Sequence, residues 1–367
     1  MEDLLELQRK KDSPRTRQAD KVRFPKMNLL EVEPDALENL VQSLGEPPYR
    51  AGQILGWVYK RGVTQIDKMT DLSKSLRQKL TEQFYISCLP LNNQKEAQDG
   101  TRKFIFRLDD DRQIESVLIR MEDTWTLCLS TQVGCRMGCR FCLTGARGFI
   151  RNLSVSEIVG QILTVRRLLP PHQHPHHWVL MGMGEPLDNY ENVVKAFKQI
   201  SSPKSLNLSP RRITLSTVGL LYRLREMAEE GLGINLAISL NAATDELRQS
   251  LMPVAQTYSL KELLDVCRAY PLPPRRRITV EYVLIRNVND SPEEAQRLAT
   301  LLRGLRCKVN LVPLNEIDSL GLRQPTPKVV IRFQEVLIAA GYTTIIRKSK
   351  GAEICGACGQ LGDSVNG

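Results

Sequence analysis

The sequence predicts an α/β fold: a partial (β/α)6 barrel preceded by a small helical domain and a connecting β-hairpin. Short apolar segments alternate with amphipathic segments from Trp125 onward, and such βα units build a parallel sheet with helices outside. The expected strands lie near 126–131, 178–183, 212–217, 234–240, 278–285 and 308–314. Six strands are fewer than the eight of a closed TIM barrel, so we expect an open crescent. A doubly wound sheet remains an alternative on this pattern alone.

Amphipathic segments that alternate with these strands predict the helices of this region. Their expected starts are near Ser154, Asn189, Leu220, Thr244, Ser259, Ser291 and Thr326. Upstream, apolar residues at helical spacing predict a helical unit. They are Leu37, Leu40, Val41 and Leu44 behind Pro34, and Leu72, Leu76 and Leu80.

Between these regions the hydrophobic period changes to two. Phe104, Phe106 and Leu108 alternate with polar residues, an acidic turn follows, and QIESVLIR over 113–120 reads as the return strand. The expected organisation is a charged tail over 1–27, a helical domain over 28–90, a linking β-hairpin over 91–124 and the partial barrel over 125–367, which ends in a cysteine-bearing segment.

Composition narrows the class of protein. No stretch approaches eighteen consecutive apolar residues and the amino terminus lacks a signal-peptide pattern, so we expect a cytoplasmic protein with no membrane partner. A formal charge of +10 favours a polyanionic partner such as nucleic acid. Nine cysteines without a secretory signal do not indicate a disulfide framework. Nothing in the sequence demands more than a monomer.

The strongest local signal is CRMGCRFC, which places Cys135, Cys139 and Cys142 just after the first barrel strand. Ligands gather at that end of parallel α/β sheets. Three thiolates can hold three irons of a cubane cluster and leave the fourth iron free for a substrate. A structural zinc site normally has four ligands, and Cys355 or Cys358 could complete one here, so zinc remains the alternative.

This CxxxCxxC loop resembles the signature of the radical S-adenosylmethionine (SAM) enzymes. The resemblance implies a 4Fe-4S cluster whose free iron binds SAM, and reductive cleavage of SAM to a 5′-deoxyadenosyl radical. GMGEP at 182–186 resembles the glycine-rich element of that superfamily, and polar residues follow the later strands. The SAM-binding residues expected on this basis are Gly184, Glu185, Ser216, Ser239, Leu240, Asn241 and Asn315.

Three longer motifs resemble the RlmN family of adenine carbon-2 methyltransferases: LCLSTQVGCRMGCRFCLTGARGF, GMGEPLDNY and GACGQL. The resemblance implies 23S rRNA as substrate, transfer RNA as an expected second one, an RNA-contacting helical domain and an electron-donating reductase. It also implies that Cys358 carries the transferred methyl group and that Cys128 releases the product by forming a Cys128–Cys358 disulfide. Glu115 would be the general base.

Two alternatives accompany this reading. A Cfr-type enzyme, which methylates carbon-8 of the same adenine, would carry the same cysteines, cluster and base. A non-catalytic zinc-ribbon RNA-binding protein would use Cys135, Cys139, Cys142 and Cys358 as zinc ligands. Cys355 departs from the family pattern, and its role is unassigned.

Overall fold

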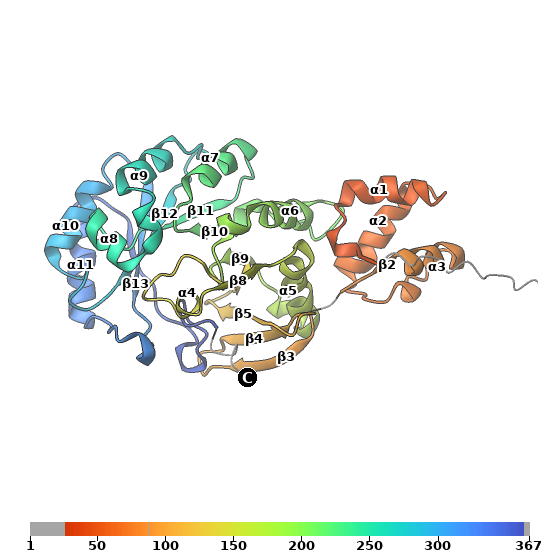
Figure 1. The fold of residues 1–367 in the computed structure, drawn as a ribbon, viewed down its shortest axis with the longest axis horizontal. Helices are drawn as coiled ribbons and strands as arrows, with labels where there is room; N and C mark the ends of the chain where they lie inside the picture. Colours follow the sequence, from red (N-terminus) through yellow and green to blue (C-terminus); the bar gives the residue numbers. More distant parts are fainter. Residues whose placement is uncertain (1–25, 88, 363–367) are drawn as a thin grey trace, which may run out of the picture.

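The computed structural model describes residues 26–87 and 89–362, so Cys88 and nearly all of the charged tail expected over 1–27 lie outside the described residues. The amino-terminal unit is helical and stands at one end of the molecule (Figure 1). Its predicted apolar stripes point inward, with Leu37, Val41, Leu76 and Leu80 all buried. Its elements are α1 (Pro34–Ser43), α2 (Tyr49–Leu55), α3 (Lys74–Gln83) and a short parallel pair, β1 (Met27–Asn28) with β2 (Phe84–Tyr85).

The parallel part of the barrel contains all six predicted strands and a seventh short one. Neighbouring strands follow one another in chain order, without the reversal that a doubly wound sheet requires, so that alternative is excluded. The strands are β6 (Trp125–Cys128), β9 (His177–Leu180), β10 (Ile213–Thr217), β11 (Asn235–Ser239), β12 (Ile278–Leu284), β13 (Cys307–Pro313) and the unpredicted β14 (Thr344–Ile346).

Helices cover the outer face of this sheet (Figure 1). They begin near the predicted residues, and the side chains of Ser154, Thr244, Ser259 and Ser291 each accept a backbone hydrogen bond from the first turn. The helices are α5 (Val155–Leu168), α6 (Tyr190–Ser201), α7 (Leu221–Glu230), α8 (Asp245–Leu251), α9 (Leu260–Ala269), α10 (Pro292–Leu301) and α11 (Pro327–Ala339).

The predicted hairpin forms as β4 (Arg102–Arg107) and β5 (Gln113–Arg120), and a third antiparallel strand, β3 (Leu91–Glu96), pairs with β4. Because β5 also pairs with β6, these strands extend the barrel sheet to ten strands instead of standing apart as a linker. The strand order ends at β3 on one side and β14 on the other, so the described sheet is an open crescent.

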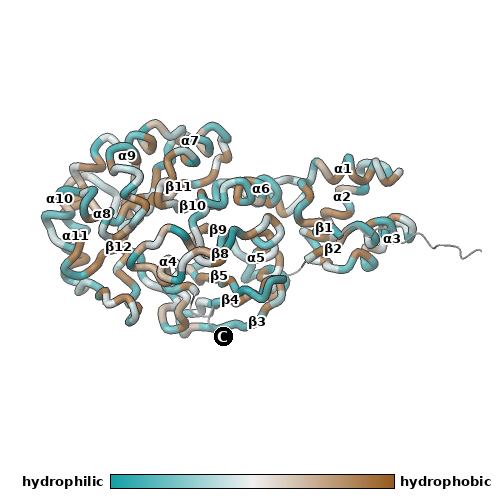
Figure 2. Tube along the Cα trace, viewed as in Figure 1, coloured by the Kyte–Doolittle hydropathy of each residue, from teal (hydrophilic) through white to brown (hydrophobic). Residues whose placement is uncertain are grey.

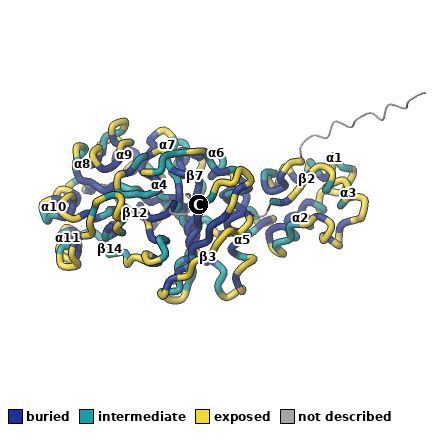
Figure 3. The backbone as a smooth tube through the Cα atoms, turned by 60° about the horizontal axis from the view of Figure 1, so that its bottom comes forward, coloured by how far each residue is buried: buried dark blue, intermediate teal, exposed yellow. Residues whose placement is uncertain are grey.

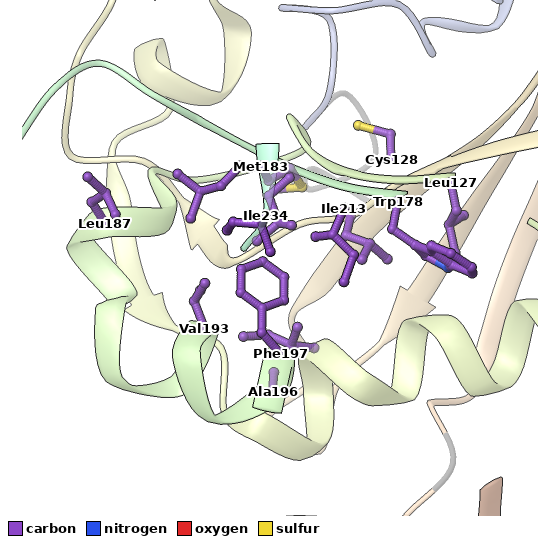
Figure 4. Packing of buried hydrophobic residues seen from close by; sticks show 14 of the residues in the cluster. Leu127, Cys128, Trp178, Met183, Leu187, Val193, Ala196, Phe197, Ile213 and Ile234 are labelled. Atoms are coloured by element: carbon purple, nitrogen blue, oxygen red, sulfur yellow. The ribbon is translucent and has the colours of Figure 1, made fainter. Parts of the chain in front are cut away.

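The core lies between the sheet and its outer helices. Figure 3 shows the strands buried and the outer faces of the helices exposed, and Figure 2 shows the matching change of hydropathy around them. In Figure 4, Phe197 of α6 packs beneath the strands, whereas Leu127 and Cys128 leave β6 on opposite faces. Within residues 26–87 and 89–362, no helix has the length and apolar character needed to cross a lipid bilayer.

Candidate active site

The cysteine loop is held by a small sheet that the sequence pattern did not reveal, β7 (Gln132–Gly134) with β8 (Phe149–Asn152), and by α4 (Leu143–Ala146). Gly134 has φ +77°, and a side chain there would lie 2.0 Å from the Gly148 carbonyl oxygen. The Cys135 N–H donates to that same carbonyl at 2.9 Å, which closes the loop. Position 134 therefore requires glycine, because β7 and the residue before β8 approach too closely there for a side chain.

Cys135, Cys139 and Cys142 all line one cavity of about 140 Å³ at the carboxyl ends of the barrel strands. Burial raises the pKa of Cys135 to about 12 and raises the pKa values of Cys139 and Cys142 as well. Thiolates at these positions therefore need a positively charged centre to hold them.

The donor set suits a cluster. Cys135, Cys139 and Cys142 line one cavity, and three thiolates can hold three corners of a cubane and leave the fourth open to a ligand. Cys358 reaches the same cavity.

The glycine-rich segment after β9 brings backbone close to this cavity. Gly184 has φ +103°, and a Cβ there would lie 2.6 Å from the Cβ of Gln132. The Glu185 carboxylate accepts hydrogen bonds from the backbone N–H groups of Leu187 at 3.0 Å and Val218 at 2.9 Å. Burial nevertheless raises the pKa of Glu185 to about 7. The segment thus offers an open backbone and a buried acceptor beside the cysteines.

Polar side chains from the next strands complete the wall. The hydroxyls of Ser216 and Ser239 lie 3.4 Å apart, and Asn241 has φ +63° and accepts from the Val283 N–H at 2.9 Å. Together with Gly184, Glu185 and Asn315, these residues line the cysteine cavity as predicted. Leu240 differs: it is fully buried, its carbonyl accepts from Arg248, and it is absent from the described cavity wall.

A second cavity, of about 840 Å³, adjoins the first, and Cys358 lines both. Cys128 lines only the second, so the two predicted relay thiols face a common space. Cys358 is solvent-accessible through these cavities, and both thiols are free in this structure. Burial raises the pKa of Cys128 to about 12, and the proximity of Cys358 adds to that rise. Burial likewise raises the pKa of Cys358.

Arg347, which the sequence analysis missed, lies near both thiols and lines both cavities. Its charge lowers the pKa of both Cys128 and Cys358, against the larger effect of burial. It follows β14, whose three residues give too little periodicity to predict a strand end there. A basic residue in a sequence segment such as RKSK also looks like ordinary surface.

Glu115 lies apart from the two cavities. Its side chain is fully buried on β5, 3.4 Å from the Lys103 ammonium, and it accepts a hydrogen bond from the Gly362 N–H at 3.2 Å. Neither of the two described cavities has Glu115 in its wall. The structure therefore brings Glu115 to the carboxyl-terminal segment that carries Cys358.

A second missed residue is Arg248, on α8. It is 1% exposed, and its guanidinium donates to the carbonyls of Val218 at 2.7 Å and Leu240 at 3.2 Å. It therefore joins the ends of β10 and β11, where Ser216 and Ser239 stand. In the sequence it occupies an amphipathic helix with charged neighbours, so nothing distinguished it from a surface residue.

Comparison with known proteins agrees with this geometry. Residues 27–86 match the family model described as "Ribosomal RNA large subunit methyltransferase N-terminal domain", and residues 129–299 match the radical SAM superfamily. A protein of Syntrophus aciditrophicus named "Dual-specificity RNA methyltransferase RlmN" is 46% identical over 92% of this chain and 96% of its own. A protein of the same name from Syntrophotalea carbinolica is 48% identical over 89% of this chain and 87% of its own.

Among solved structures, a radical SAM methyltransferase from Sphaerobacter thermophilus superposes with a TM-score of 0.87 at 40% identity. The match covers 91% of this chain and 99% of that one, so it includes the helical unit, the antiparallel strands and the barrel together. The chain belongs to the RlmN family of radical SAM methyltransferases, whose cofactors are a 4Fe-4S cluster and SAM.

Proposed function

We propose that this enzyme methylates carbon-2 of an adenine in 23S rRNA, and the same position of an adenine beside the anticodon of transfer RNA. The names of the relatives support an RNA substrate with dual specificity. The observation that carries the proposal is that Cys128 and Cys358 face one cavity, while Cys358 also reaches the cavity lined by the cluster cysteines. A thiol at this junction can receive a group from one side and deliver it to the other.

Cys135, Cys139 and Cys142 would hold the cluster, and the polar groups of Glu185, Ser216, Ser239, Asn241 and Asn315, with the open backbone at Gly184, would bind SAM. When bound, these cofactors supply a methyl group and a carbon radical able to remove a hydrogen atom. The protein supplies position: Asn315 donates to the Cys358 carbonyl at 2.9 Å and so fixes that residue beside the SAM-binding wall.

In the proposed relay the sulfur of Cys358 carries the methyl group, which loses a hydrogen atom to the SAM-derived radical and bonds to carbon-2; the unpaired electron left on the adduct would return to the cluster. The thiolate of Cys128 then attacks the Cys358 sulfur, so a disulfide forms as the sulfur–carbon bond breaks. The electron pair of that bond stays with the transferred carbon, which takes up a proton to become the methyl group while carbon-2 loses its own proton. Arg347 favours the thiolate that this attack needs. A separate reductase would restore both thiols before the next turnover.

We propose Glu115 as the base that takes the carbon-2 proton. Its carboxylate is now bonded to the Gly362 N–H and paired with Lys103, so the transfer requires the Gly362 contact to open.

The second cavity suits a nucleotide. Five basic residues line it, Arg120, Lys308, Arg347, Lys348 and Lys350, against three acidic ones, Asp99, Glu122 and Glu281. An excess of positive charge around a cavity attracts phosphates, and an enzyme acting on a base needs room for one turned out of its stack. With a net charge of +10, the chain as a whole favours the same class of partner. We further propose that it acts as a cytoplasmic monomer.

The test is an anaerobic assay with SAM, a strong reductant and protein-free 23S rRNA, followed by mass spectrometry of the nucleosides. The proposal predicts 2-methyladenosine with wild type and none with Cys358→Ala. Formation of 8-methyladenosine would assign the chain to the Cfr type instead. A colourless protein with one stoichiometric zinc and no methylated nucleoside would favour the zinc-ribbon alternative.

A further inference from the structure

The carboxyl-terminal segment of residues 351–362, here called the strap, carries Cys358 and has little regular structure. Its only helical turn is Ala352–Ile354, and Cys355 has φ +51°. Such a segment holds its shape only if its surroundings fix it. Figure 1 shows the last described part of the chain, in blue, beside α4 and the antiparallel strands, so the strap lies between the barrel and its antiparallel extension.

The barrel holds one side of the strap. The Leu143 N–H donates to the Gly359 carbonyl at 2.8 Å, and the Thr144 hydroxyl donates to the Leu361 carbonyl at 2.7 Å. Both donors follow Cys142 directly in the chain, so the strap is bonded to the cluster loop. These contacts set the distance of Cys358 from the cofactor side of the site.

A buried ion pair holds the other side. Lys103 on β4 and Glu115 on β5 are both completely buried and lie 3.4 Å apart. Lys103 is paired in register with Val117, so Glu115 is its diagonal neighbour across the two strands. The Lys103 ammonium donates to the Cys355 carbonyl at 3.3 Å, and Glu115 accepts from the Gly362 N–H at 3.2 Å. The pair thus bonds the strap on both sides of Cys358.

The buried ion pair adds little to the stability of the two strands. Two charges removed from water lose a hydration free energy that their mutual attraction scarcely restores, and two apolar side chains would often stabilise the strands equally well. The ion pair therefore needs a reason beyond the stability of β4 and β5. The two strap bonds give one, because charged groups make stronger hydrogen bonds to backbone than neutral groups do.

We propose that Lys103 is a positioning residue: with Glu115 it fixes both ends of the strap and so holds the Cys358 thiol at the junction of the two cavities. The consequence for catalysis rests on the proposed methyl relay, whereas the anchoring itself does not. The antiparallel strands are then part of the active-site scaffold, and their buried charges act through the backbone of the strap.

The experiment compares Lys103→Met/Glu115→Gln with wild type in full-length protein purified without oxygen. The double variant leaves neither member of the buried ion pair charged, and the side-chain amide introduced by Glu115→Gln keeps an acceptor for the Gly362 N–H, so the strap bond that is lost is the one from Lys103 to the Cys355 carbonyl. Lys95→Met is the matched control, since Lys95 is the exposed cross-strand neighbour of Lys103 on β3.

Amide hydrogen exchange is the first reading. We expect exchange in peptides covering 351–362 to be about tenfold faster in the double variant, with exchange in α11 and in the Lys95 control unchanged. Unchanged strap exchange, or faster exchange throughout the chain, would overturn the proposal. The exchange measurement needs neither RNA nor turnover, so it tests the anchoring of the strap independently of the proposed methyl transfer.

The second reading is kinetic. If Lys103 positions Cys358, the double variant should lower the rate at which bound SAM methylates Cys358 about tenfold relative to wild type, with the affinity for SAM within about twofold. This step precedes the proposed proton transfer to Glu115, so the loss of that base does not affect it. A wild-type rate of Cys358 methylation, or a loss confined to SAM affinity, would contradict the positioning role.

Discussion

Arg248→Met removes a buried cation that joins the ends of two barrel strands. Desolvation lowers the pKa of Arg248 to about 10, so the guanidinium is still charged at neutral pH. It donates to the Val218 carbonyl at 2.7 Å and to the Leu240 carbonyl at 3.2 Å. Methionine has similar length and no donor, so the variant leaves these buried acceptors without their partner.

The magnitude follows from those two bonds. Hydrogen bonds from charged groups contribute about 1.5–3 kcal/mol each, so the gross loss is about 3–6 kcal/mol. Methionine avoids the desolvation cost of a buried guanidinium, which offsets part of the loss and leaves about 2–4 kcal/mol. SAM affinity should fall as well, by about tenfold for each 1.4 kcal/mol that reaches the site, because Ser216 and Ser239 stand on the strands that Arg248 joins.

The assay is urea unfolding of the cofactor-free protein, followed by calorimetric titration of the reconstituted protein with SAM. Arg248→Lys is the control, since it keeps the charge and one donor and should lose less of both quantities. If Arg248→Met unfolds at the wild-type urea concentration and binds SAM as tightly, the buried guanidinium does not organise the strand ends and the reasoning is wrong.

Three further predictions follow from the site. Gly184→Ala places a methyl group 2.6 Å from Gln132 at φ +103°, so it should cost about 2–4 kcal/mol and weaken SAM binding; an unchanged melting temperature would refute the close approach. Burial raises the pKa of Glu185 from 4.5 to about 7, so the folded chain binds this proton more tightly than the unfolded chain. Stability should therefore fall by about 3 kcal/mol as pH rises from about 4.5 to 7, and a Glu185→Gln variant with the same pH dependence would contradict this. Arg347→Gln should move the pH profile of product release to higher pH, because the cation that lowers the pKa of Cys128 is lost; an unmoved profile would remove Arg347 from thiol activation.

The elements that could be predicted from the sequence are those with a local signal. The six predicted parallel strands are short and mainly apolar, and the helices between them, such as those that begin at Ser154 and Ser259, are amphipathic. β3 was missed because all six of its residues are exposed and show no alternation, and β14 because it has three residues. β7 and its partner β8 have three and four residues, too few to show a periodic signal.

The site residues likewise fall into those with a local sequence signal and those without one. Cysteine spacing and the glycine-rich segment predict the cluster and SAM residues, because that chemistry requires those residue types close together in the chain. Arg248 and Lys103 are buried and Arg347 is half-buried in the wall of both cavities, and only the fold creates these placements, since charged residues are ordinarily exposed. Glu115 was named through family resemblance alone, and its place beside Lys103 shows a contact that no spacing predicts.

The central claim, that Cys358 is joined to the RNA until Cys128 releases it, is tested most directly with Cys128→Ala. Incubated anaerobically with SAM, reductant and 23S rRNA, this variant should accumulate a covalent protein–RNA adduct, which mass spectrometry of digested material should map to the Cys358 sulfur. Cys128→Ala/Cys358→Ala should form none. If Cys128→Ala instead yields free methylated RNA at the wild-type rate and no adduct, the two-thiol relay is wrong.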